Sequence, residues 1–184
     1  TYIGGHQLRP GAIHANDARD VPLGEASGEI TPRVERLAAL LSAAGIPSAP
    51  VSDIRRTFWT KLLGNMAFNP LSAITLQTLG EIVTEPNSAE LARSIMEEVI
   101  RLCSEGLGME LGTTAQERIS GLRSGATLSH KTSMLQDWEA GKRLELEHIC
   151  GAALEISEWV GVDMPVSRNL YALLQARAGH LASL

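Results

Sequence analysis

Polar residues recur at helical spacing within the apolar run 58–71. Lys61, Asn65 and Asn69 are four residues apart, so on a helix of 3.6 residues per turn they project along nearly one line. A solvated helix face usually carries mixed charges, and this one does not. The pattern predicts a helix whose polar stripe faces a pocket or a second domain. Pro70 lacks a backbone donor and crowds the preceding turn, so the helix is expected to kink or stop after Asn69.

The first thirty residues have a different pattern from the rest. Residues 1–30 contain short apolar pieces separated by Gly, Pro, Asn and Asp, which predicts brief β-strands and turns. So few strands cannot form a stable sheet alone, so we expect them to be the edge of a larger sheet. After Thr31 the apolar spacing becomes helical, and about six helices are expected to follow.

Start and stop signals divide the helical part. Asn87–Glu90 resembles a capping box after Pro86, and the S-x-x-Q pattern of Ser133–Gln136 makes Ser133 a candidate N-cap as well as a candidate ligand. Gly161 is expected to end one helix and Pro165 to begin the last.

Composition and charge narrow the function classes. The chain has 184 residues, of which 44% are hydrophobic and 20% charged, as is ordinary for a soluble globular protein. A net charge of −5 and only 4% aromatic residues argue against a nucleic-acid surface. No apolar run has the length of a membrane span, so no membrane partner is expected. Cys103 and Cys150 are far apart and predict reduced, buried thiols in a cytoplasmic protein.

A metal site is not expected either. Glu145, Glu147 and His148 lie close together in the sequence, but they lack the H-E-x-x-H spacing of a helical zinc site. A small molecule or another protein is therefore the expected partner.

Two segments of the chain resemble the ketopantoate reductase family. Residues 58–74 read FWTKLLGNMAFNPLSAI and resemble the family pattern W-x-K-L-x-x-N-x-x-x-N-P-L-x-A-I. Residues 132–151 read TSMLQDWEAGKRLELEHICG and resemble its S-M-x-Q-D and G-x-x-T-E-I-x-x-I-N-G patterns. The resemblance covers about residues 1–180.

The resemblance implies a mostly α fold. Residues 51–184 are expected to form an all-helical domain of the 6-phosphogluconate dehydrogenase C-terminal-like type, for substrate binding, catalysis and dimerisation. Residues 1–50, with a few strands and one helix, would be the C-terminal remnant of a Rossmann NADP-binding domain.

The resemblance also implies a reaction, in which NADPH reduces the 2-keto acid 2-dehydropantoate to pantoate. In that reading Lys61 is the general acid, and Glu145 is catalytic, contacts the substrate and lies on the nicotinamide side. Asn65, Asn69 and Ser133 bind the substrate. Hydride addition to a ketone creates an alkoxide, which a cationic donor stabilises and then protonates.

Without the resemblance, simpler interpretations of the same residues hold. Lys61 would be a surface lysine whose stem packs on apolar neighbours, and Asn65 and Asn69 would be amides without a function. Ser133 would only cap a helix. Glu145 would favour a helix start through the helix dipole.

Two positions depart from the family pattern. Leu79 and His130 stand where the family has substrate-contacting asparagines. His130 stays among the predicted substrate-binding residues, but the loss of two amides predicts a preference for another 2-keto acid.

The sequence contains no G-x-G-x-x-G turn after a strand, so it lacks a dinucleotide phosphate site. We therefore expect this chain to be a fragment that is inactive alone, and its strand edges to pair with a second copy in a homodimer. Two alternatives remain open. One is a helical binding or oligomerisation module without catalysis, and the other is a 2-hydroxyacid dehydrogenase related to the 6-phosphogluconate or glycerol-3-phosphate dehydrogenases.

Overall fold

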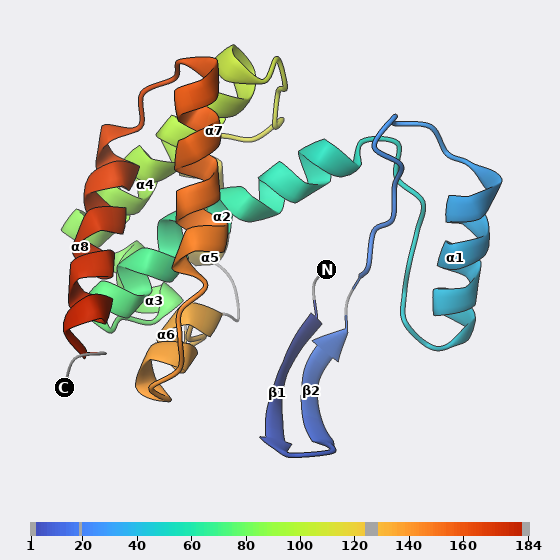
Figure 1. The fold of residues 1–184 in the computed structure, drawn as a ribbon, viewed down its shortest axis with the longest axis horizontal. Coiled ribbons are helices and arrows are strands. Elements are labelled where there is room, and N and C mark those ends of the chain that lie inside the picture. The colour runs from blue at the N-terminus through green and yellow to red at the C-terminus, as the bar shows by residue number, and fades with distance from the viewer. Residues whose placement is uncertain (1–2, 19, 124–128, 182–184) are drawn as a thin grey trace. The chain divides into compact units, whose positions relative to one another are not determined.

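The computed structural model describes residues 3–18, 20–123 and 129–181, and most of them are helical, which confirms the predicted fold class (Figure 1). The chain divides into two compact units, Thr1–Phe58 and Trp59–Leu184, called here the N-terminal and C-terminal units. The division falls inside the long helix α2, Ile54–Thr75.

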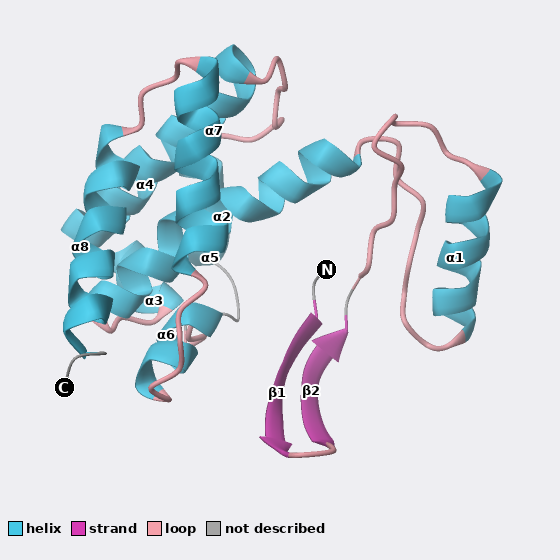
Figure 2. Cartoon of the chain, viewed as in Figure 1, coloured by secondary structure: helices cyan, strands magenta, loops and turns pink. Residues whose placement is uncertain are grey.

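Strands occur in the N-terminal unit, as the sequence predicts. β1 (Ile3–Arg9) pairs antiparallel with β2 (Ala12–Ala18) in a hairpin whose turn contains Gly11 at φ 79° (Figure 2). Glycine adopts this left-handed conformation without steric cost. A further apolar piece of this region, around Leu23, forms an isolated parallel bridge to Pro50, and the Val21 amide donates to the Pro47 carbonyl at 2.9 Å.

Helix α1 (Pro32–Ala43) completes the N-terminal unit. Thr31 is its N-cap and accepts a hydrogen bond from the Val34 amide, as the Thr–Pro pair predicts. Ile30, Leu37 and Leu40 stay exposed, at 50%, 46% and 68%. The apolar side of this unit is therefore only partly covered by the described residues.

The C-terminal unit is built from helices around one core. After α2 come α3 (Leu79–Thr84), α4 (Pro86–Arg101), the π-helix η1 (Leu102–Gly106), α5 (Ala115–Arg123), α6 (Ser133–Glu139), the π-helix η2 (Glu147–Gly151), α7 (Ala152–Val160) and α8 (Pro165–Leu181). Side chains below 2% exposure come from α2, α3, α4, η1, α6, α7 and α8, and they include Leu63, Met66, Ile82, Ile95, Leu102 and Leu174. Each such side chain contributes roughly 1.5–3 kcal/mol on burial.

Helix α2 continues through Pro70 to Thr75, so the predicted stop after Asn69 is wrong, whereas the alternative, a kink at Pro70, stays a prediction. Every residue from Met66 to Ala73 is buried, and this packing offsets a proline cost of about 3 kcal/mol. The last turn has further partners. The Thr75 hydroxyl donates to the Leu71 carbonyl at 2.8 Å, and the Arg177 guanidinium of α8 donates to the Ile74 carbonyl.

Two predicted helix starts lie slightly too late in the sequence. The cap of α4 is Glu85, whose carboxylate accepts from the Asn87 and Ser88 amides at 3.1 and 2.6 Å, with Pro86 as the first helical residue. The cap of α6 is Thr132, whose hydroxyl accepts from the Leu135 amide at 3.2 Å. Ser133 is therefore not the N-cap.

Helices α4 and α8 are joined by a buried carboxylate. Glu98 of α4 is 4% exposed and accepts hydrogen bonds from the Val166 amide, the Ser167 amide and the Ser167 hydroxyl, at 2.8, 2.9 and 2.7 Å. The first turn of α8 otherwise lacks partners for its amides, so this side chain fixes where α8 begins.

Both cysteines are free and buried, as predicted. Burial raises the pKa of the Cys103 thiol to about 11 and that of Cys150 to about 12, with the Glu147 carboxylate adding to the effect at Cys150. Within the described ranges, no helix is both long and apolar enough to cross a bilayer.

Candidate functional site

Lys61, Asn65 and Asn69 lie along one side of α2, and their burial increases along the helix. Lys61 and Asn65 are half-buried, whereas Asn69 is only 5% exposed. Four residues correspond to about 6 Å of helix rise, so the stripe runs from the accessible part of the helix into the core. A half-buried ammonium next to an amide can hold a polar ligand atom and supply a proton to it.

A second cation lies beside this stripe, and sequence reasoning missed it. The guanidinium of Arg118, on α5, lies 3.6 Å from the position that a Cβ on Gly64 would occupy. Gly64 follows Lys61 by three residues and precedes Asn65. No local signal in the sequence predicts this contact, because it depends on how α5 docks on α2.

The two positions that depart from the family pattern are neighbours in space. The Leu79 amide, at the start of α3, donates to the His130 carbonyl at 3.0 Å. Leu79 is half-buried and the His130 side chain is exposed. Ser133 follows three residues later as the first residue of α6 and is exposed. The structure therefore brings the His130 and Ser133 segment against the start of α3.

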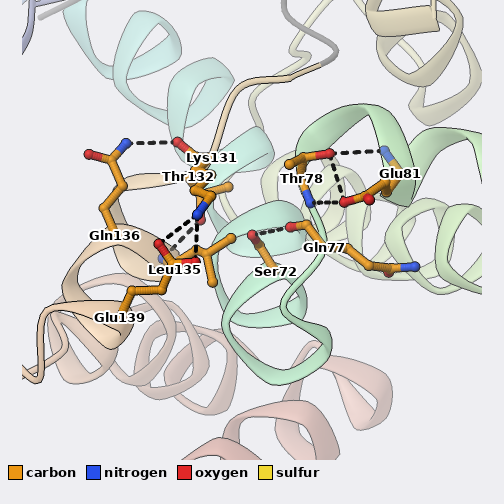
Figure 3. Close-up of polar contacts among 9 residues, drawn as sticks. All are labelled: Ser72, Gln77, Thr78, Glu81, Lys131, Thr132, Leu135, Gln136 and Glu139. Carbon is orange, nitrogen blue, oxygen red and sulfur yellow. Dashed lines mark hydrogen bonds and ion pairs between the residues drawn. The ribbon is translucent and has the colours of Figure 1, made fainter.

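Residues next to Leu79 and next to His130 form local hydrogen bonds and an ion pair (Figure 3). Before α3, the Thr78 amide donates to the Glu81 carboxylate at 2.7 Å, and the Glu81 amide donates to the Thr78 hydroxyl at 3.3 Å. The Thr78 amide also holds the pKa of Glu81 below its usual value. Before α6, the Lys131 ammonium pairs with Glu139 at 2.6 Å. The backbone at Leu79 and His130 is thus held from both sides.

Helix α3 is absent from the sequence prediction, although the sequence contains a signal for its start. Thr78 and Glu81 form a reciprocal capping box, and the T-x-x-E spacing is visible in the sequence. The Ser72 hydroxyl, near the end of α2, donates to the Gln77 carbonyl at 2.6 Å and shapes the turn between the two helices.

Glu145 makes no described contact with the other predicted residues. Its side chain is exposed, and within the described part of the chain its carboxylate makes no hydrogen bond or ion pair. Its carbonyl accepts from the Ile149 amide at 3.1 Å, which places Glu145 at the entry to η2. No described contact links its carboxylate to Ser133 or Asn69.

A cavity of about 1150 Å³ lies between α6, the segment leading to η2 and α8. Of the described residues that line it, none belongs to the predicted site; they are Leu76, Trp138, Glu139, Gly141, Lys142, Arg143, Leu144, Leu146, Glu147, Gln175 and Ala178. The Trp138 ring in its wall is covered by the Arg177 guanidinium, 4.6 Å from the ring centroid.

The described residues do not provide a cofactor phosphate site or a metal site. Their strands form an antiparallel hairpin, without the strand, glycine-rich turn and helix that bind a dinucleotide. Among the same residues, no three His, Cys, Asp or Glu side chains gather in a way that would hold a metal ion.

Comparison with known proteins relates this geometry to a family. The model of the ketopantoate reductase PanE/ApbA C-terminal family matches residues 53–178. A 2-dehydropantoate 2-reductase of Mesorhizobium japonicum is 37% identical over 169 residues, covering 92% of this chain and 51% of that protein. One of Archaeoglobus fulgidus is 34% identical over 153 residues, covering 83% of this chain and 51% of that protein.

A solved structure agrees in fold. The crystal structure of 2-dehydropantoate 2-reductase from Methylococcus capsulatus superposes with a TM-score of 0.88 at 28% identity, over 98% of this chain and 57% of that one. The chain thus spans about half the length of the relatives it matches. The family match covers α2 to α8 with the whole stripe of Lys61, Asn65 and Asn69, and we conclude that the chain belongs to the ketopantoate reductase family.

Proposed function

We propose that this chain supplies the substrate side of an NADPH-dependent oxidoreductase that reduces a 2-keto acid, either 2-dehydropantoate or a related compound. The observation that carries the proposal is the half-buried Lys61 on a stripe with Asn65 and Asn69, inside the segment that matches the family. The names of the relatives support the reaction class.

Each proposed residue has a chemical duty in this reaction. The ammonium of Lys61 stabilises the alkoxide oxygen that forms when hydride adds to the ketone carbon, and it then donates a proton to that oxygen. Asn65 and Asn69 orient the substrate without neutralising the ammonium. Ser133 and His130 contact the rest of the substrate, and the Glu145 carboxylate holds a substrate hydroxyl or the lysine. The hydride itself comes from NADPH.

Of the two candidates, we propose a preference for a related 2-keto acid over 2-dehydropantoate. Leu79 and His130 replace two family asparagines, and they lie next to each other through the 3.0 Å backbone hydrogen bond. One continuous part of the site therefore loses two amides at once. With fewer amide partners at this position, the site discriminates less in favour of a hydroxylated 2-keto acid.

The two units have separate proposed duties. Residues 1–50 would complete a Rossmann domain, and the exposed Leu37 and Leu40 of α1 support this because a larger domain would cover them. Residues 51–184 would bind the substrate. We also propose a homodimer; a ketopantoate reductase from Staphylococcus aureus that shares the fold at 21% identity is dimeric. A cytoplasmic setting fits the two free thiols.

The test measures NADPH oxidation by the full-length reductase against a panel of 2-keto acids with polar and apolar side groups. Lys61→Ala is expected to lower kcat by about 10²–10⁴-fold, the usual contribution of a general acid. Lys142→Ala, which removes an exposed lysine at an ion-pair distance of 3.7 Å from Asp137, serves as the matched control and should leave kcat within about twofold.

Two outcomes would contradict the proposal. Turnover that survives Lys61→Ala would remove Lys61 as the acid. A full-length protein that oxidises NADPH with no member of the panel would favour a helical binding module without catalysis.

A further inference from the structure

Three side chains join η2 to α8. The Tyr171 hydroxyl donates to one Glu147 carboxylate oxygen at 2.5 Å, and the Gln175 amide donates to the other at 2.9 Å. The Gln175 amide also donates to the Tyr171 hydroxyl at 2.7 Å. We call Glu147, Tyr171 and Gln175 the Glu147 brace. Both carboxylate oxygens are engaged, which restricts the rotation of Glu147.

The ionisation of both partners reflects this contact. Hydrogen bonds from Tyr171 and then Gln175 hold the pKa of Glu147 below its usual value. Burial, followed by the hydrogen bond to Glu147, raises the pKa of Tyr171 to about 12. Near neutral pH the pair is therefore a phenol that donates to a carboxylate, and charge-assisted hydrogen bonds of this kind are the stronger ones.

Because Gly151 has no side chain, the Glu147 carboxylate and the Tyr171 hydroxyl can lie close to its backbone. A Cβ at Gly151 would lie 2.7 Å from the Glu147 carboxylate and 3.3 Å from the Tyr171 hydroxyl. Gly151 is the last residue of η2, one π-helical turn after Glu147. π-helical turns are rare in proteins, and those that occur often lie at functional sites. The π-helical turn and the glycine together let the carboxylate fold back over the helix.

The brace acts on the backbone that carries Glu145. Glu145 precedes Glu147 by two residues, and its carbonyl accepts from the Ile149 amide within the same turn. The Glu145 side chain is exposed and has no partner of its own among the described residues. The backbone of this turn therefore sets where the Glu145 side chain starts and which positions its carboxylate can reach, and the brace ties that backbone to α8.

We infer that Tyr171, through Glu147, is a positioning residue that aims Glu145 at the substrate. The inference rests on the proposed function, in which the Glu145 carboxylate works at the substrate. An error of about 1 Å in such a group can cost on the order of 100-fold in rate. Because Tyr171 lies on α8, the last helix of the unit then contributes to the reaction without touching the substrate.

The test uses Tyr171→Phe in the full-length reductase, assayed well below its unfolding temperature. The change removes one hydroxyl and keeps the ring, so we expect kcat to fall roughly tenfold. Arg168→Ala is the matched control, because it breaks another α8 contact, the 2.8 Å ion pair with Glu158, without touching the brace. It should leave kcat within about twofold.

A double-mutant cycle separates positioning from simple stability. Adding Tyr171→Phe to Glu145→Gln should change kcat by less than about twofold, because the group that Tyr171 positions is already altered. The inference is overturned if the loss of kcat in the double variant equals the product of the losses in the two single variants. An unchanged kcat in Tyr171→Phe alone also overturns it. Gln175→Ala, which removes the second donor, should lower kcat in the same direction and serves if Tyr171→Phe does not fold.

Failure of the inference can be told from failure of the proposed function. If the wild-type protein reduces a 2-keto acid and Glu145→Gln is impaired while Tyr171→Phe is normal, only the inference falls. If Glu145→Gln retains full activity, the role proposed for Glu145 falls as well.

Discussion

Glu98 shows how one side chain fixes the position of a whole helix. Its removal in Glu98→Ala would leave the Val166 amide and both polar groups of Ser167 without their acceptor. Each unsatisfied buried group costs about 1–3 kcal/mol, so the loss of the acceptor for three groups should lower the free energy of unfolding by at least about 3 kcal/mol. Urea denaturation monitored by circular dichroism measures this loss.

The neighbouring glutamate provides the control. Glu97 is 49% exposed and pairs with Arg93 on the same helix. Exposed pairs contribute at most about 1 kcal/mol, so Glu97→Ala should move the urea midpoint far less. If the two changes lower the free energy of unfolding equally, the hydrogen bonds from the first turn of α8 to Glu98 do not contribute to stability.

At the scale of elements, close helix packing depends on Gly106. A Cβ there would lie 2.5 Å from Val160 Cγ2, 3.1 Å from Val162 Cγ2 and 3.3 Å from Leu102 Cδ1. β-branched valines cannot easily rotate away. Gly106→Ala should therefore destabilise the protein by about 1–3 kcal/mol, as overpacked cores do.

For a second glycine, Gly121, we expect that replacement by alanine stabilises the protein. A Cβ on Gly121, inside α5, would meet no atom of the described residues within 4 Å. Gly121→Ala should stabilise the helix by up to about 1 kcal/mol. Thermal unfolding of the two variants side by side checks both signs, and a loss in Gly121→Ala would contradict this packing.

The elements also show what the sequence could and could not predict. The sequence predicted the end of α7 at Gly161 and the start of α8 at Pro165, because both signals are local. Pro86 could have placed the cap of α4 at Glu85, because proline suits the first helical position. The persistence of α2 beyond Pro70 could not be read locally, because it depends on burial by distant helices. The approach of Arg118 to Gly64 is equally long-range.

At the scale of the molecule, the C-terminal unit has its own core. The buried cluster starts at Trp59 and ends at Leu174, and all of it lies in that unit. A fragment of residues 53–184 should therefore fold alone and unfold in one cooperative transition in urea, with helical circular dichroism. A fragment without a cooperative transition would show that the N-terminal unit is needed for folding.

The contact between Arg177 and the Ile74 carbonyl has a consequence for protein synthesis. The two residues are separated by 103 positions in the chain. While the ribosome is still making the segment between them, the end of α2 has only water for that carbonyl, and the face of Trp138 lacks its guanidinium. The helix that carries Lys61 is therefore translated before α8, and it gains this contact only when α8 emerges from the exit tunnel.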